Sequence, residues 1–118
     1  MSLPNQTEVV LRLAELSRLL DAATVEVAAL DEAAVRAKQQ HEVAAARAYL
    51  TAEGSIEARK AQAVIACADL ALESELAQAK HRACRERIRT IGTQLDTGRT
   101  LSAAIRNQFM AEPIGQHT

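Results

Sequence analysis

The sequence predicts an all-α protein: a long antiparallel two-helix hairpin, coiled-coil-like, that assembles into an oligomeric helical bundle. Alanine supplies 25 of the 118 residues, and aromatic residues make up only 2% of the chain. With so few large side chains, long helices in close contact are favoured over a globule with a thick core. The chain has only four Gly and two Pro, too few for the turns of a β or α/β domain. At this length we expect one domain, residues 1–118.

The first helix is predicted over residues 5–52. Asn5 is a suitable N-cap, and Glu8, three residues later, completes a capping box. Apolar residues then recur at alternating spacings of three and four, the heptad pattern of a helix packed against another helix. The positions of this first seam are Val9, Leu13, Leu16, Leu20, Ala23, Val27, Leu30, Ala34, Ala37, His41, Ala44, Ala48 and Thr51.

A turn between the helices is predicted at residues 53–55. Gly54 can adopt the positive φ that ends one helix, and Ser55 is a natural N-cap for the next. Glu57 then lies in the first turn, where the helix dipole favours an acid. The segment is therefore interpreted as a structural corner and not as a functional loop.

The second helix is predicted over residues 56–111, with a loose tail at 112–118 after Pro113 and Gly115. A second apolar stripe lies on a face next to its main seam, and one partner helix cannot cover both faces. We therefore expect a bundle made by more than one chain. The main seam is Ile56, Lys60, Ala63, Cys67, Leu70, Ser74, Ala77, His81, Cys84, Ile88, Ile91, Leu95, Gly98, Ser102, Ile105 and Phe109; the second stripe is Ile65, Ala68, Leu72, Leu76, Ala79 and Ala83.

A turn at 53–55 also fixes which residues face each other across the hairpin. Large aliphatic residues meet near the termini, whereas alanines face each other near the turn, so the helices should approach most closely there. The predicted pairs are Leu16 with Ile91, Leu13 with Leu95, and Leu20 with Ile88.

The same pairing leaves residues 101–110 without a partner on the first helix. Leu101, Ile105, Phe109 and Met110 would then be exposed in a monomer. Exposed apolar clusters commonly mark interfaces. These four residues are the predicted protein-binding surface.

Four arginines of the second helix, Arg82, Arg85, Arg89 and Arg99, are candidate contacts for nucleic acid. The first three lie at i, i+3 and i+7 on one helical face, and clustered arginines can follow a phosphate backbone. Interhelical ion pairs with nearby acids of the first helix would explain the same residues without a ligand. No aromatic side chains are interleaved for base stacking. Nucleic-acid binding is therefore possible but not favoured. The acids in question are Glu15, Asp21 and Glu26.

No cofactor and no metal is expected, and the chain is predicted not to be an enzyme. His81 and Cys84 form an H-x-x-C pair, and His41 lies near Cys67 across the hairpin, but a structural zinc site needs four ligands. The two pairs are roughly 21 Å apart along the helix, so they are better explained as small semi-polar seam residues that set the register. No nucleophile elbow or phosphate loop is present.

A cytoplasmic location is expected, without membrane association. The start of the chain does not resemble a signal peptide, and no apolar run approaches the roughly 18 residues that span a bilayer. Cys67 and Cys84 lie about 25 Å apart on one predicted helix, too far for a disulfide. Free thiols are typical of a reducing compartment.

Two segments, AEGSIEARKAQAVIACADLAL and IRTIGTQLDTGRTLSAAIRNQF, resemble a group of small helical proteins encoded by tailed bacteriophages. That group has an E-G-[ST]-x-x-x-R-K turn followed by a D-x-G-R-[ST]-L-x-S-A helix. The resemblance covers roughly residues 49–109 and implies a protein of the host cytoplasm whose gene lies among those for DNA recombination and replication. It implies no settled activity. The residues aligned with the two motifs are Glu53, Gly54, Ser55, Arg59, Lys60, Asp96, Gly98, Arg99, Thr100, Leu101, Ala103 and Ala104, with Ala103 at the position of the motif's Ser.

These features predict a non-enzymatic, phage-type interaction protein that acts through self-association and protein binding. Its partners would be further copies of the chain, or a host or phage protein. The alternative is a nucleic-acid-binding accessory factor in phage DNA recombination or replication, and a structural virion component is a third class.

Overall fold

The chain consists of three helices in the computed structural model, which describes the backbone of residues 4–116 and the side chains of residues 4–108. In chain order they are α1 (Gln6–Thr51), α2 (Ile56–Ala66) and α3 (Ala68–Gln116). All regular structure in this described part is helical, which confirms the all-α class. The bounds of α1 almost coincide with those predicted from its cap and heptad pattern.

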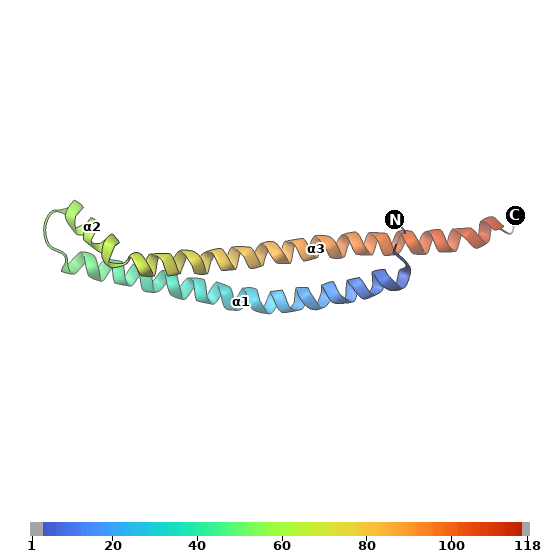
Figure 1. The fold of residues 1–118 in the computed structure, drawn as a ribbon, viewed down its shortest axis with the longest axis horizontal. Helices are drawn as coiled ribbons and strands as arrows, with labels where there is room; N and C mark the ends of the chain where they lie inside the picture. Colours follow the sequence, from blue (N-terminus) through green and yellow to red (C-terminus); the bar gives the residue numbers. More distant parts are fainter. Residues whose placement is uncertain (1–3, 117–118) are drawn as a thin grey trace. The chain divides into compact units, whose positions relative to one another are not determined.

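The helices form two compact units, to each of which α1 and α3 contribute. Unit 1 comprises residues 1–24 and 86–118, and unit 2 comprises Val25–Arg85 with the turn and α2. Within each unit α1 and α3 lie side by side and run in opposite directions (Figure 1). This is the antiparallel helical hairpin that the sequence predicts.

Side-chain caps begin α1 and α2. Asn5 Oδ1 accepts a hydrogen bond from Glu8 N–H at 2.8 Å, and Glu8 Oε2 accepts one from Asn5 N–H at 3.1 Å. At the turn, Gly54 has a φ of 108°, a conformation that side chains with a Cβ rarely adopt. Ser55 Oγ then accepts from Ala58 N–H at 3.2 Å. Each cap satisfies backbone donors that a helix start leaves without partners.

The second predicted helix is interrupted at Cys67, so the expectation of one helix over 56–111 is wrong. The helical hydrogen bonds end with Cys67 N–H donating to Ala63 O at 3.1 Å and resume with Ala71 N–H donating to Cys67 O at 2.9 Å. Cys67 itself has φ −108° and ψ 15°, away from helical values. Because α2 runs in a different direction from α3 (Figure 1), Ile56 and Lys60 are exposed and do not join the seam.

The end of α3 also differs from the prediction, because the helix continues beyond residue 111 to Gln116. The expected stop at Pro113 and Gly115 does not end it. A proline removes one backbone donor from the ladder, and a glycine lowers helix propensity by about 1 kcal/mol. Of the predicted loose tail, residues 112–116 are therefore helical, and residues 117–118 lie outside the described residues.

The core of unit 1 is built from large aliphatic side chains of both helices. Leu16, Ala23, Ile91 and Leu95 are buried in one cluster, and Leu13, Leu20 and Ile88 pack against it. The members of all three predicted residue pairs lie in this cluster or pack against it. Farther along, Gln6 Nε2 donates to Ser102 Oγ at 3.2 Å, which links the start of α1 to α3.

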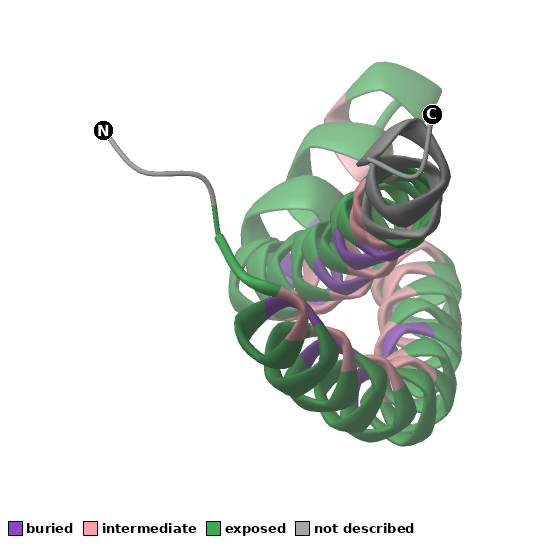
Figure 2. Ribbon diagram, turned by 90° about the vertical axis from the view of Figure 1, so that its right-hand side faces the viewer, coloured by how far each residue is buried: buried purple, intermediate pink, exposed green. Residues whose placement is uncertain are grey.

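The core of unit 2 is made of small side chains. Ala34, Ala63, Cys67, Ser74 and Cys84 are buried there. Because alanine, serine and cysteine occupy little space, the helices can approach closely at the positions that the first seam fills with alanine. In both units the buried residues lie on the facing sides of the paired helices (Figure 2), and every first-seam residue except Thr51 is at least partly buried.

Candidate functional site

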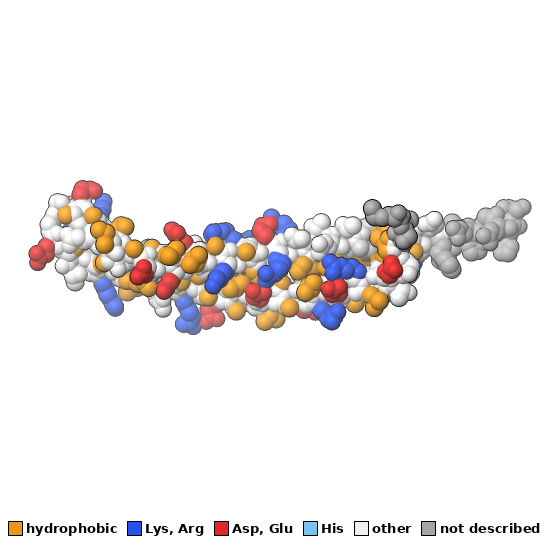
Figure 3. Space-filling model, in the orientation of Figure 1, with side chains coloured by type: hydrophobic (Ala, Val, Ile, Leu, Met, Phe, Trp, Pro, Cys, Tyr) orange, Lys and Arg blue, Asp and Glu red, His pale blue; other side chains and the backbone are white. Residues whose placement is uncertain are grey.

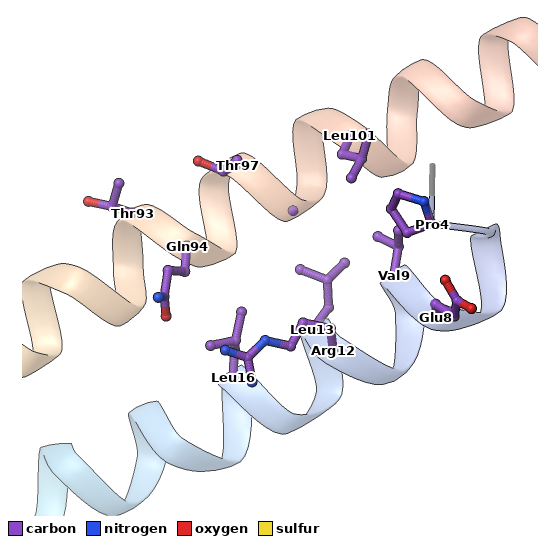
Figure 4. A pocket seen from close by; sticks show the side chains of 11 residues that line it. Pro4, Glu8, Val9, Arg12, Leu13, Leu16, Thr93, Gln94, Thr97 and Leu101 are labelled. Carbon is purple, nitrogen blue, oxygen red and sulfur yellow. The ribbon is translucent and has the colours of Figure 1, made fainter. Parts of the chain in front are cut away.

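A groove lies between α1 and α3 in unit 1. Its volume is about 480 Å³. Figure 4 shows Leu13 and Leu16 of α1 directed toward α3, with Leu101 approaching from the opposite side and Pro4 beside Val9. The lining residues are Pro4, Glu8, Val9, Arg12, Leu13, Leu16, Thr93, Gln94, Thr97, Gly98 and Leu101.

Gly98 permits the close packing at the floor of this groove. A Cβ atom built on Gly98 would lie 2.6 Å from Cδ2 of Leu13, well inside van der Waals contact. Gly92, six residues earlier on α3, has nothing within 4 Å of the corresponding Cβ position. The two glycines that both lower helix propensity thus differ in what they do for packing.

Two of the four residues of the predicted protein-binding surface are less exposed than expected. Leu101 and Ile105 are both half-buried. Pro4 and Val9 line the same groove as Leu101, and Gln6 Nε2 donates to Oγ of Ser102, the next residue of α3. The start of α1 and the segment before it therefore reach this part of α3, which the predicted pairing leaves without a partner. The side chains of Phe109 and Met110 lie outside the described residues.

The candidate nucleic-acid arginines divide into paired and unpaired residues. Arg89 forms an ion pair with Glu86 at 3.1 Å, and Arg99 forms one with Asp96 at 3.5 Å, both on α3. Arg82 and Arg85 are exposed and have no ion-pair partner among the residues that the structure describes.

In unit 1, Glu15 of α1 does not pair with these arginines. Glu15, one of the three acids expected to pair across the hairpin, bonds Arg12 of its own helix at 3.1 Å. In unit 2 an interhelical contact is made instead by His81 Nε2 and Asp31 Oδ1, 3.8 Å apart. Pairing with Glu15 therefore does not account for the arginines of α3.

The second apolar stripe is exposed over its whole length, as expected for a face that α1 cannot cover. The exposed fractions are 77% for Ile65, 54% for Leu72 and 53% for Leu76. Ala68, Ala79 and Ala83 are exposed as well. Figure 3 shows hydrophobic side chains at the surface over α2 and the start of α3, with acidic side chains beside them.

Both cysteines are free thiols and both are buried, Cys67 at the junction of α2 and α3 and Cys84 on α3. Within the described part of the chain, no group of three or more His, Cys, Asp or Glu side chains is placed to hold a metal ion. None of the described helices has a stretch apolar and long enough to cross a membrane.

Comparisons of the chain with protein-family models, with curated proteins and with solved structures found no match. The grounds for a function are therefore the surfaces themselves: the groove of unit 1, the arginines of α3 and the exposed stripe of α2 and α3.

Proposed function

We propose that this chain is a non-enzymatic helical protein that acts by binding proteins, copies of itself included. The observation that carries the proposal is the exposed second stripe. Leu72 and Leu76 are each more than half exposed, one turn apart, on a helix whose other face already packs against α1. Complete burial of a leucine side chain stabilises an association by roughly 1.5–3 kcal/mol, so an apolar row of this kind favours a partner.

Sedimentation of the purified chain over a range of concentrations tests this function. We expect a mass above that of the monomer, or capture of a defined partner that binds with the same stoichiometry in purified form. A chain that stays monomeric and binds no purified partner would contradict the proposal.

A pair of variants locates the surface. Leu72→Ser with Leu76→Ser is expected to weaken the association, because it removes the two largest side chains of the stripe on α3. Leu11→Ser with Leu19→Ser removes exposed leucines from α1 and is the matched control. Weakened association in the control alone would place the interface on α1.

The setting proposed for this function is the cytoplasm of a bacterial host, with the chain encoded by a phage. The support is the resemblance of the turn around Gly54 and of the helix around Gly98 and Arg99 to small phage proteins. Detection of the chain by mass spectrometry in the cytoplasm of infected cells, early in infection, is the expected result. Detection only in purified virions would favour the structural class instead.

A second candidate function, nucleic-acid binding, is favoured by one observation: Arg82 and Arg85 are exposed and have no ion-pair partner among the described residues. Mobility-shift titrations with single- and double-stranded DNA at two salt concentrations test it. Arg82→Ala with Arg85→Ala should then weaken binding and reduce its salt dependence, whereas Arg47→Ala on α1 should not. No salt-sensitive binding at micromolar protein would contradict this candidate.

A further inference from the structure

Beside the exposed stripe of α3, two acidic residues are followed along the helix by two basic residues. Glu73 and Glu75 lie in its first part, and Lys80 and Arg82 follow, each base seven residues after an acid. All four side chains are exposed, and none has an ion-pair partner among the residues that the structure describes. A row of unpaired acids followed by a row of unpaired bases lies along one apolar face.

The four charges also divide between the two sides of the stripe. Glu73 follows Leu72 and Lys80 follows Ala79, so this acid and this base lie on the same side. Glu75 precedes Leu76 and Arg82 precedes Ala83, which places the second acid and base on the opposite side. At about 3.6 residues per turn, residues seven apart return to nearly the same direction.

We propose that a second copy of this chain covers the stripe, with its α3 antiparallel to the first. This arrangement rests on the proposed function and names its partner and orientation. Flanking residues on the same side face each other when two helices pack antiparallel, so Glu73 meets the second copy's Lys80 and Glu75 meets the second copy's Arg82. The twofold symmetry of a homodimer repeats both pairs, so all eight charges find an opposite charge.

The apolar positions fit the same alignment. Leu72 lies opposite the second copy's Ala83, and Leu76 lies opposite the second copy's Ala79. A large side chain therefore meets a small one at each level, which permits close approach without leaving a void. A parallel arrangement would bring Glu75 near the second copy's Lys80, five residues further along, but would leave Glu73 and Arg82 without an opposite charge. The antiparallel arrangement pairs all four charges, so charge complementarity favours a second copy in this orientation.

Charge reversal, with sedimentation equilibrium of the full chain in low salt, tests the proposal. Glu73→Lys with Glu75→Lys, and separately Lys80→Glu with Arg82→Glu, each turn four attractive contacts into repulsive ones and should weaken the dimer at least about ten-fold. An equimolar mixture of the two variants should restore it. The chain carrying all four changes should dimerise as the wild type does, because its attractive pairs are regenerated in reverse.

Two controls accompany these variants. Arg47→Glu with Lys60→Glu changes the net charge as much as the Lys80 and Arg82 variant does, at exposed positions outside the stripe, and should leave the dimer affinity unchanged. Helicity by circular dichroism checks that each variant folds. All four flanking side chains are exposed, so their reversal should leave helicity unchanged.

The outcomes separate this inference from the function on which it rests. A wild type that associates, with all charge variants associating equally well, would overturn the antiparallel α3 pairing and leave protein binding in place. The pairing is equally overturned if the two double variants weaken the dimer but neither their mixture nor the fourfold variant recovers it. A wild-type chain that is monomeric throughout would overturn the self-association as well.

Discussion

Gly98 of α3 and Leu13 of α1 lie so close together that no other residue fits at position 98 without a movement of its neighbour. A Cβ on Gly98 would be 2.6 Å from Leu13 Cδ2. Since the methyl group of a half-buried leucine can rotate away, the contact limits substitution without forbidding it. Gly92 and Gly98, two glycines of α3 that differ in this respect, can therefore be compared directly.

Gly92→Ala is expected to raise the free energy of unfolding by about 1 kcal/mol, the difference in helix propensity between the two residues. Nothing lies within 4 Å of the added methyl group. Gly98→Ala gains the same propensity but must displace the Leu13 side chain, so its net effect should be clearly smaller or negative. Urea unfolding of both variants measures the difference, and equal gains would contradict the close contact.

Asn5→Ala should lower the free energy of unfolding by about 1 kcal/mol, because it removes the side-chain acceptor at the start of α1. The lost bond is the 2.8 Å contact with Glu8 N–H. Asn5→Ser keeps an acceptor and is the control, with a smaller expected loss. Hydrogen exchange of the first turn of α1 should accelerate in the alanine variant only; identical exchange in both would argue against the cap.

Gly54→Ala should destabilise the chain by about 1–3 kcal/mol, the usual strain of a non-glycine residue in a sparsely populated region. Gly54 has a φ of 108°, and an added Cβ would also lie 3.3 Å from Ala58 Cβ. The opposite sign is expected for Gly92→Ala, where φ is helical. Thermal unfolding of the two variants side by side checks this, and two changes of the same sign would contradict it.

Ser74→Leu should lower the free energy of unfolding by about 1–3 kcal/mol, because overpacking forces apart side chains that already fit closely. Ser74 is buried in the small-residue core of unit 2, with an exposed fraction of 3%. Ser74→Ala keeps the volume small and removes only the bond that Gln78 Nε2 donates to Ser74 Oγ at 3.0 Å, so its effect should be within about 1.5 kcal/mol. A leucine variant as stable as the alanine variant would mean that the core of unit 2 is loosely packed.

Much of the fold follows from the sequence because heptad positions report directly which side of a helix is covered. The first seam from Val9 to Ala48 is at least partly buried at every position, and the second stripe from Ile65 to Ala83 is exposed throughout. Both results depend on periodicity alone. The capping residues are equally readable, since Asn5 and Ser55 act through short-range hydrogen bonds with residues three positions away.

Periodicity and capping residues do not predict the interruption at Cys67 or the partial burial of Leu101. Helix breaks are usually signalled by proline or glycine, and neither is present at Cys67. Leu101 shares a groove with Pro4, which precedes α1 and belongs to no periodic pattern. In the candidate sites, Arg89 and Arg99 form ion pairs with acids of their own helix. Which of the nearby acids an arginine pairs with depends on side-chain conformation, and the spacing of residues in the sequence does not determine it.

Because the thiols of Cys67 and Cys84 are buried, their reactivity reports how often unit 2 opens locally. A thiol reagent can reach either sulfur only when the surrounding helices separate, so the rate of alkylation of the native chain measures how often they do. One cysteine marks the junction of α2 with α3, and the other lies on α3 near the end of unit 2. Comparing their alkylation rates would show which of these two places opens first, without any introduced label.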